Sequence, residues 1–122
     1  MNSFEDLEVW KECRRFRKEV SILTKTFPAD ERFRLSDQLL RSSRSVTSNI
    51  AEGHGRYHYQ ENIQSCRQAR GSLSESLDHL ITALDEGYID NNLLEKYREL
   101  YAHCLKLLNG YILYLKKKKN NE

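Results

Sequence analysis

Hydrophobic residues recur along most of the chain at alternating steps of three and four, which places them on one face of an α-helix. The clearest series is Val9, Cys13, Phe16, Val20, Leu23 and Phe27. Ser3, followed three residues later by Asp6, is a candidate N-cap. Pro28 should end the segment, because the residue before a proline avoids the α conformation. These signals predict a first helix over about residues 4–26.

Three further segments repeat this spacing. Asp30 and Asp90 are candidate N-caps, and Gly87 is a natural residue just beyond a helix C-terminus. The predicted helices span about residues 30–53, 59–86 and 91–117, with a basic tail over 116–122. Four long helices with short connections favour antiparallel neighbours. The chain, residues 1–122, is therefore predicted to be one all-α domain, an up-down-up-down four-helix bundle.

Composition agrees with a globular helical chain and adds little about partners. Of 122 residues, 39% are hydrophobic and 31% charged, and one proline with five glycines leaves little room for turns. A net charge of +2 is too small to indicate a nucleic-acid partner by itself. The run Lys116–Lys119 suits either a solvated helix C-terminus or contacts with phosphates.

The cysteines and the absence of targeting signals favour the cytoplasm. Cys13, Cys66 and Cys104 are widely spaced, with no CxxC pair. No signal peptide is apparent, and no run approaches the ~20 apolar residues of a membrane span. We expect a reduced cytoplasmic protein with its cysteines in the core.

The stretch SNIAEGHGRYHYQE, residues 48–61, has three readings: a phosphate loop, a metal site or a helical corner. Gly53-His54-Gly55 lacks the preceding strand and the GK[ST] that a phosphate loop needs. His54 and His58 lie on either side of Gly55, with no cysteine nearby, which argues against a metal. We expect a corner with solvent-facing histidines and neither metal nor cofactor.

Arg98 and His103 have the Arg-x4-His spacing of a ribonuclease motif in some small helical toxin domains. Five residues on a regular helix rotate by ~140°, so these side chains should diverge. No other catalytic constellation stands out. We therefore expect no catalytic residues.

A polar network is predicted between the second and third helices. With a turn centred near Arg56, antiparallel packing pairs position i with about 112 − i. Arg41 then lies beside Gly71, with Glu75 one turn away. We hypothesise that Gly71 makes room for Arg41 and that Glu75 pairs with it, because a buried unpaired charge is costly.

Nearer the corner, Asn49 and Glu52 are predicted to hold Arg56 and the exposed amides of the third helix. The alternative is a set of unrelated surface polar residues.

The fourth helix has an unusually wide apolar face that is rich in tyrosine. It suits either a deep core position or contact with another subunit, since aromatic residues are enriched at interfaces. The predicted subunit interface consists of Trp10, Tyr97, Tyr101, Tyr111 and Tyr114.

Several motifs together resemble those of the 23S rRNA intervening sequence family. The shared features are Phe4 with Leu7, Val9 and Trp10; Phe27-Pro28 with Glu31; the block from Gln38 to Arg56 containing Asn49-Ile50-Ala51-Glu52-Gly53; and Ala69, Gly71, Ser72 and Glu75. The matches cover roughly residues 4–75. Arg34, Thr47 and the serine pair Ser42-Ser43 depart from the glycine, proline and alanines common in the family.

The resemblance implies a bundle that assembles as a ring-like homopentamer without known catalytic activity. Some members of the family are encoded within insertions in 23S rRNA genes. The family is also similar to the accessory protein of diversity-generating retroelements, a basic pentamer that binds nucleic acid and a reverse transcriptase.

Three functions follow for testing. The first is a non-enzymatic oligomeric binding protein that contacts RNA or DNA; the second is a protein-interaction scaffold; the least favoured is a helical ribonuclease. None involves a membrane, a cofactor or an evident small-molecule substrate. The candidate nucleic-acid contacts are Arg14, Arg15, Lys18, Arg56, Arg67, Lys116, Lys117, Lys118 and Lys119.

Overall fold

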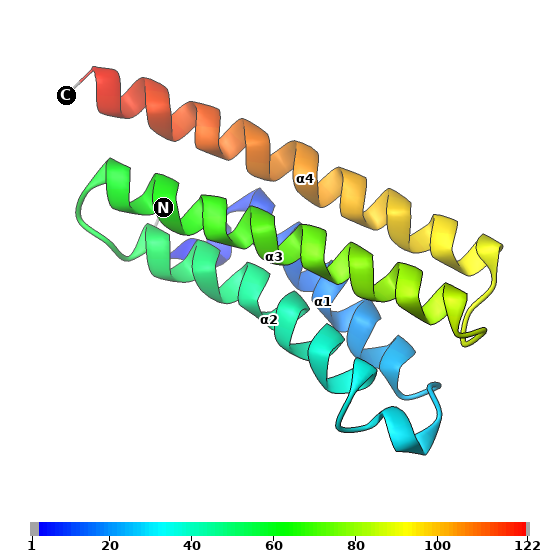
Figure 1. Ribbon diagram of the computed structural model, residues 1–122. Coiled ribbons are helices and arrows are strands. Elements are labelled where there is room, and N and C mark those ends of the chain that lie inside the picture. Colours follow the sequence, from blue (N-terminus) through cyan, green and yellow to red (C-terminus); the bar gives the residue numbers. More distant parts are fainter. Residues whose placement is uncertain (1–2, 122) are drawn as a thin grey trace.

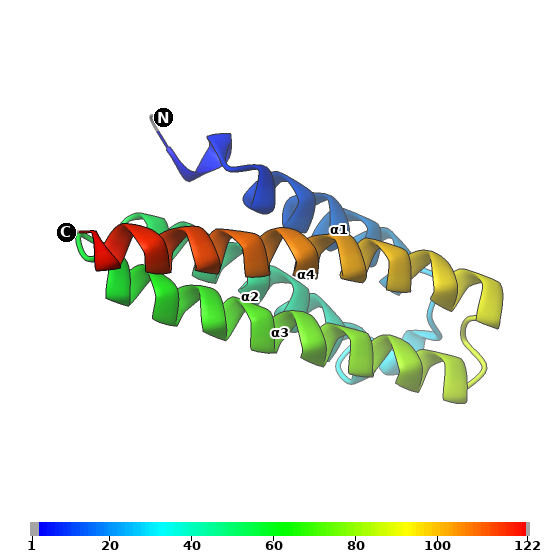
Figure 2. The same ribbon diagram turned by 90° about the horizontal axis from the view of Figure 1, so that it is seen from above.

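The computed structural model describes residues 3–121, and every regular element among them is a helix (Figure 1). The elements are η1 (Phe4–Asp6), α1 (Glu8–Thr24), η2 (Ala29–Glu31), α2 (Leu35–His54), α3 (Tyr59–Asp85) and α4 (Asn91–Asn120). Successive α-helices run in opposite directions, and both chain ends lie at the same end of the bundle (Figures 1 and 2). Helices α1 and α3 each pack against both α2 and α4. Among the described residues, the diagonal pairs α1–α3 and α2–α4 are not in contact. The predicted all-α four-helix bundle is confirmed.

Each long helix contributes its apolar stripe to one core. Phe16, Leu39, Leu73 and Leu108, one from each α-helix, are fully buried. Burying a side chain of this size stabilises the fold by roughly 1.5–3 kcal/mol. The whole apolar series predicted for the first helix, from Val9 to Phe27, is also buried.

The three cysteines are core residues, as predicted. Cys13, Cys66 and Cys104 are buried and form no disulfide. Burial raises the pKa of Cys66 to about 11. The hydrogen bond with Cys104, followed by burial, raises the pKa of Cys13 further. The Cys13 and Cys66 thiols therefore remain protonated and unreactive near neutral pH.

The first two helices begin later than predicted. Ser3 does act as a cap, but for η1, where its hydroxyl accepts from the Glu5 N–H at 2.9 Å. Leu7 then adopts an extended conformation and is buried, so α1 begins only at Glu8.

Asp30 was wrongly predicted as an N-cap, because it lies inside η2 and α2 begins only at Leu35. A contact from a distant corner holds this segment, since the Tyr88 hydroxyl donates to Glu31 at 3.0 Å. The ring of Tyr88 also packs 5.5 Å from that of Phe27. The backbone leaves helical geometry at Arg34, with φ −123 and ψ −110, so η2 is separate from α2.

The ends of α3 and α4 follow the predicted signals. Gly87 has φ 78, and the hydrogen bonds from its N–H to Leu84 and from Tyr88 N–H to Ala83 form a Schellman motif. Asp90 caps α4 by accepting from the Leu93 N–H at 2.8 Å. Helix α4 extends beyond the predicted end at residue 117 to Asn120. Its terminal lysines stabilise this end, because their positive charges interact favourably with the helix dipole.

Serine hydroxyls, not charges, join α2 to α3. Ser42 and Ser76 are 2.8 Å apart between their hydroxyl oxygens, as are Ser45 and Ser72. The predicted register placed Arg70 opposite Ser42. The structure places Ser76 there, because α2 continues through His54 and the corner is centred later than Arg56.

The predicted Arg41–Glu75 pair is therefore wrong. Arg41 is exposed and donates to Asp37 at 2.9 Å, while Glu75 contacts His79 at 3.1 Å. Gly71 faces open space, with no atom within 4 Å of a Cβ built on it. Small hydroxyls fill the narrow seam without the desolvation cost of a buried charge.

Gly53 marks a close approach between the two helices, although the sequence suggested a helix stop. It is buried within the last turn of α2. A Cβ built there would lie 2.7 Å from Asn62 Oδ1 and 2.8 Å from Ser65 Cβ. Any larger residue would force α2 and α3 apart.

We expect Gly53→Ala to lower the free energy of unfolding by about 1–2 kcal/mol, because overpacking outweighs the helix propensity of alanine. Gly71→Ala is the matched control. It has open space and should raise the free energy of unfolding by about 0.5–1 kcal/mol. Urea unfolding monitored by circular dichroism measures both. A neutral or stabilising Gly53→Ala would contradict the close approach.

Ser42→Ala and Ser76→Ala should each cost about 0.5–1.5 kcal/mol, and their combination should cost less than the sum. Each substitution removes the same hydroxyl–hydroxyl contact, so the second substitution lowers the free energy of unfolding by less than it would alone. A double-mutant cycle in urea measures this coupling, with exposed Ser48→Ala as a near-neutral control. Strict additivity would show that the two hydroxyls do not interact.

Candidate nucleic-acid interface

Helix α1 carries four basic side chains on its outer face: Lys11, Arg14, Arg15 and Lys18, here called the α1 basic stripe. Their spacing places all four on one side of the helix. With Glu19 they line a shallow groove of about 380 Å³. Arg14, Arg15 and Lys18 are candidate contacts from the sequence, and the structure places Lys11 beside them.

The charges of the α1 basic stripe remain available to a partner. Lys11 contacts Glu8 at 3.4 Å and Arg15 contacts Glu12 at 4.0 Å, both within one helical turn. Such exposed pairs contribute little and are screened by salt. Arg14 instead lies over the Trp10 ring, 5.7 Å from its centroid.

Arg17, next to the α1 basic stripe, has a structural role. It donates to the Thr47 hydroxyl of α2 at 2.9 Å. Thr47 stands where a proline is common in the family that the motifs resemble. This threonine connects α1 to α2.

A second basic group, the C-terminal basic cluster, consists of Arg67 and Lys116–Lys119. Arg67, Lys116 and Lys119 line a groove of about 240 Å³ between α3 and α4. Lys119 donates to Gln60 of α3 at 2.6 Å. The structure thus brings Arg67 beside the lysines, which the sequence could not show.

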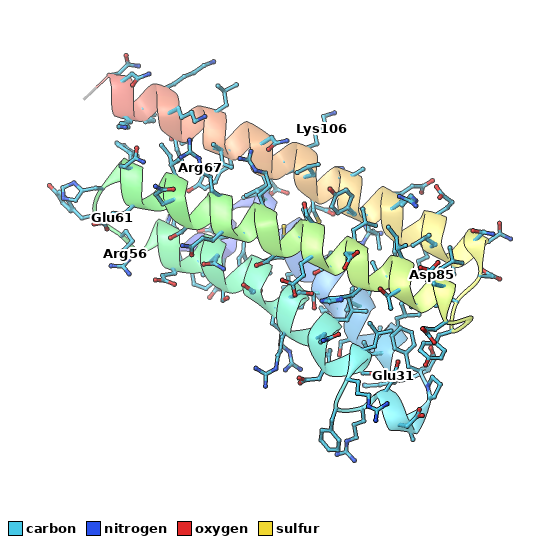
Figure 3. The ribbon with its side chains drawn as sticks, in the orientation of Figure 1. Glu31, Arg56, Glu61, Arg67, Asp85 and Lys106 are labelled. Atoms are coloured by element: carbon cyan, nitrogen blue, oxygen red, sulfur yellow. The ribbon has the colours of Figure 1, made fainter. Side chains whose placement is uncertain are left out.

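Arg67 and the α1 basic stripe lie on separate faces, because α1 and α3 occupy diagonal positions in the bundle. Arg56 lies at the α2–α3 corner (Figure 3). It donates to Glu52 at 3.0 Å, one of the contacts predicted from the sequence. The acidic side chains of Glu31 and Asp85 lie toward the opposite end of the bundle.

The predicted role of Asn49 at the corner is wrong. Its amide donates to the Ser45 carbonyl at 2.8 Å and to the Ser45 hydroxyl at 3.0 Å. Asn49 lies one turn before Gly53, so its side chain lies along the contact between α2 and α3 and not at the corner. It therefore supports the serine contacts.

The largest aromatic concentration lies at the end of the bundle where the α2–α3 corner meets the end of α4. A pocket of about 440 Å³, here called the corner pocket, opens there. Its lining comprises Leu7, His54, Arg56, Tyr57, His58, Tyr59, Asn62, Tyr111, Tyr114 and Leu115. Both histidines were predicted to face solvent. This is confirmed for His58, which is exposed, whereas His54 is partly buried, and both line this pocket.

The sequence matches the 23S rRNA-intervening sequence protein family over residues 5–110. The chain belongs to this family. The resemblance carried by the motifs is thereby confirmed, and the match extends beyond them into α4.

A solved structure has a similar fold. It is a protein of unknown function from the S23 ribosomal protein family of Bacteroides thetaiotaomicron, with a TM-score of 0.79 and 24% identity. The alignment covers 85% of this chain and 94% of that one. This likeness supports the fold. No curated protein matches the sequence.

In this member of the family, the predicted tyrosine interface divides into core and surface. Tyr97 was wrongly assigned to the interface: it is buried, and its hydroxyl donates to the Glu19 carbonyl at 3.0 Å. Burial raises the pKa of Tyr97 to about 12, so the hydroxyl keeps its proton. Trp10, Tyr101 and Tyr111 are partly buried, whereas Tyr114 is exposed.

Arg98 and His103 do not share a partner. Arg98 donates to Glu95 on its own helix at 3.0 Å. His103 lies 3.8 Å from Glu12 on α1. Within residues 3–121, no three His, Cys, Asp or Glu side chains are grouped as metal ligands would be. No helix in that range is long and apolar enough to span a membrane.

Proposed function

We propose that this protein is a non-enzymatic, cytoplasmic, oligomeric binding protein that contacts RNA or DNA. The α1 basic stripe is the observation that carries the proposal. Four cations on one exposed helical face present the regular positive charge that a phosphate backbone attracts. The C-terminal basic cluster provides a second, weaker contact region.

Assembly would multiply the effect of these modest groups. Several copies of one basic face on a rigid oligomer bind a long polyanion with avidity, even when the net charge of each copy is only +2. The homopentamer implied by the family resemblance is the expected state. Leu113 supports it, because this residue is 54% exposed on α4 next to Gly110, which faces open space.

A protein-interaction scaffold is the second candidate. Ile22 and Phe33 are large exposed hydrophobic residues that lie outside α4, with exposures of 59% and 83%. Such side chains suit a protein partner better than a phosphate backbone. This function requires the oligomer but no nucleic acid.

Replacing Arg14, Arg15 and Lys18 together with glutamine should weaken binding to a 30-base-pair duplex and reduce its salt dependence. Each lost phosphate contact lowers the slope of log K against log salt by about 0.9. The charge-matched control replaces Arg32, Arg34 and Arg41 with glutamine. Fluorescence anisotropy across a salt series measures both. If the wild-type protein binds neither duplex DNA nor structured RNA at low salt, the nucleic-acid function is contradicted and the protein-interaction scaffold remains as the candidate.

Light scattering should give a mass near five times the 14.5 kDa chain. Leu113→Glu should reduce this mass, because it places a charge in the proposed subunit contact. Phe33→Glu, an equally large change at another exposed site, should leave the mass unchanged. A monomeric wild-type protein would contradict both candidate functions.

A further inference from the structure

We propose that the corner pocket takes an unpaired nucleobase from a single-stranded nucleic acid. This inference rests on the proposed function and gives it a substrate class. The basic groups described above attract any polyanion, whereas the corner pocket offers different chemistry: aromatic walls, an apolar floor and fixed polar groups. Its volume of about 440 Å³ lies in the range of small-molecule sites.

The aromatic walls provide stacking surfaces. Tyr111 and Tyr114 are stacked on each other, with ring centroids 6.1 Å apart and planes 15° apart. Tyr57 is 93% exposed and contacts His58 edge-on at 4.8 Å. A ring this exposed adds almost nothing to the core, so its faces are free to stack on a base.

One polar group in the pocket is oriented by the fold. Asn62 donates to the Tyr111 hydroxyl oxygen at 3.2 Å, so the tyrosine proton can point elsewhere. Burial raises the pKa of Tyr111, which keeps that proton in place. The Oδ1 of Asn62 already accepts from the Cys66 thiol at 3.5 Å, and Gly53 lies close beside it. Tyr111 can therefore donate to an acceptor on a base edge.

The charges around the pocket favour a base over a phosphate. Arg56 contacts Glu52 and also lies in the field of Glu61, so carboxylates offset the guanidinium at the rim. Lys118 lies over the Tyr114 ring, 5.7 Å from its centroid. An uncharged base can enter beside Arg56, whose charge Glu52 offsets, while the adjoining phosphates lie toward Lys118 and the rest of the C-terminal basic cluster. A base-paired nucleotide cannot present its face in this way.

The test compares a 12-nucleotide single strand with a hairpin duplex, each labelled for fluorescence anisotropy, in DNA and RNA forms. Tyr57→Ala should weaken single-strand binding about 5- to 100-fold and leave duplex binding unchanged. Tyr57→Phe keeps the ring and should retain single-strand binding. Phe33→Ala, which removes an equally exposed ring elsewhere, is the matched control and should have no effect.

Three outcomes would overturn the inference. The first is wild-type single-strand affinity in Tyr57→Ala, or an equal loss on the duplex. The second is a lower oligomer mass for Tyr57→Ala by light scattering, which would make a second copy the occupant. The third is binding of free AMP or UMP as tight as that of the single strand and equally weakened by Tyr57→Ala.

The failure of the proposed function has a different signature. Duplex binding that depends on the α1 basic stripe, without any single-strand dependence on Tyr57, would overturn the base pocket alone. Absence of salt-sensitive binding to both probes would overturn the proposed function as well.

Discussion

The close contact between α2 and α3 determines much of this bundle. At Gly53 the two helices leave no room for even a methyl group, and the paired hydroxyls of Ser42 and Ser76 hold the adjoining seam together. Side chains this small allow dispersion contacts between backbones that larger residues would prevent. The seam excludes charged residues, because a buried ion pair would need more space and would have to repay its desolvation.

The same contact positions the α2–α3 corner. Since α2 keeps its helical geometry through His54, the chain reverses over only a few residues and presents Tyr57 to solvent. Asn62, which lies against Gly53, is fixed in turn and bonds to Tyr111 of α4. A packing constraint between two helices therefore shapes a pocket that includes a third.

The charged residues are arranged around this core in groups that the net charge conceals. The total of +2 conceals a basic stripe on α1 and a basic cluster at the end of α4, while Glu31 and Asp85 lie toward the opposite end of the bundle. Proteins with balanced totals can still bind polyanions, because the local field of a charged face determines the attraction. The family assignment alone names no partner, so these groups and the aromatic corner carry the functional argument.

The sequence by itself determined the helices, their apolar faces and the family. Periodicity identified the apolar series from Val9 to Phe27, which begins in α1 and ends just beyond it. Local signals fixed the helix ends at Gly87 and Asp90, because those signals act within a few residues. Register, in contrast, depends on the fit of surfaces distant in sequence. The structure alone placed Ser76 opposite Ser42, separated Arg41 from Glu75 and put Tyr97 in the core. It alone assembled the corner pocket, since residues from both ends of the chain and its middle meet there only after the helices pack.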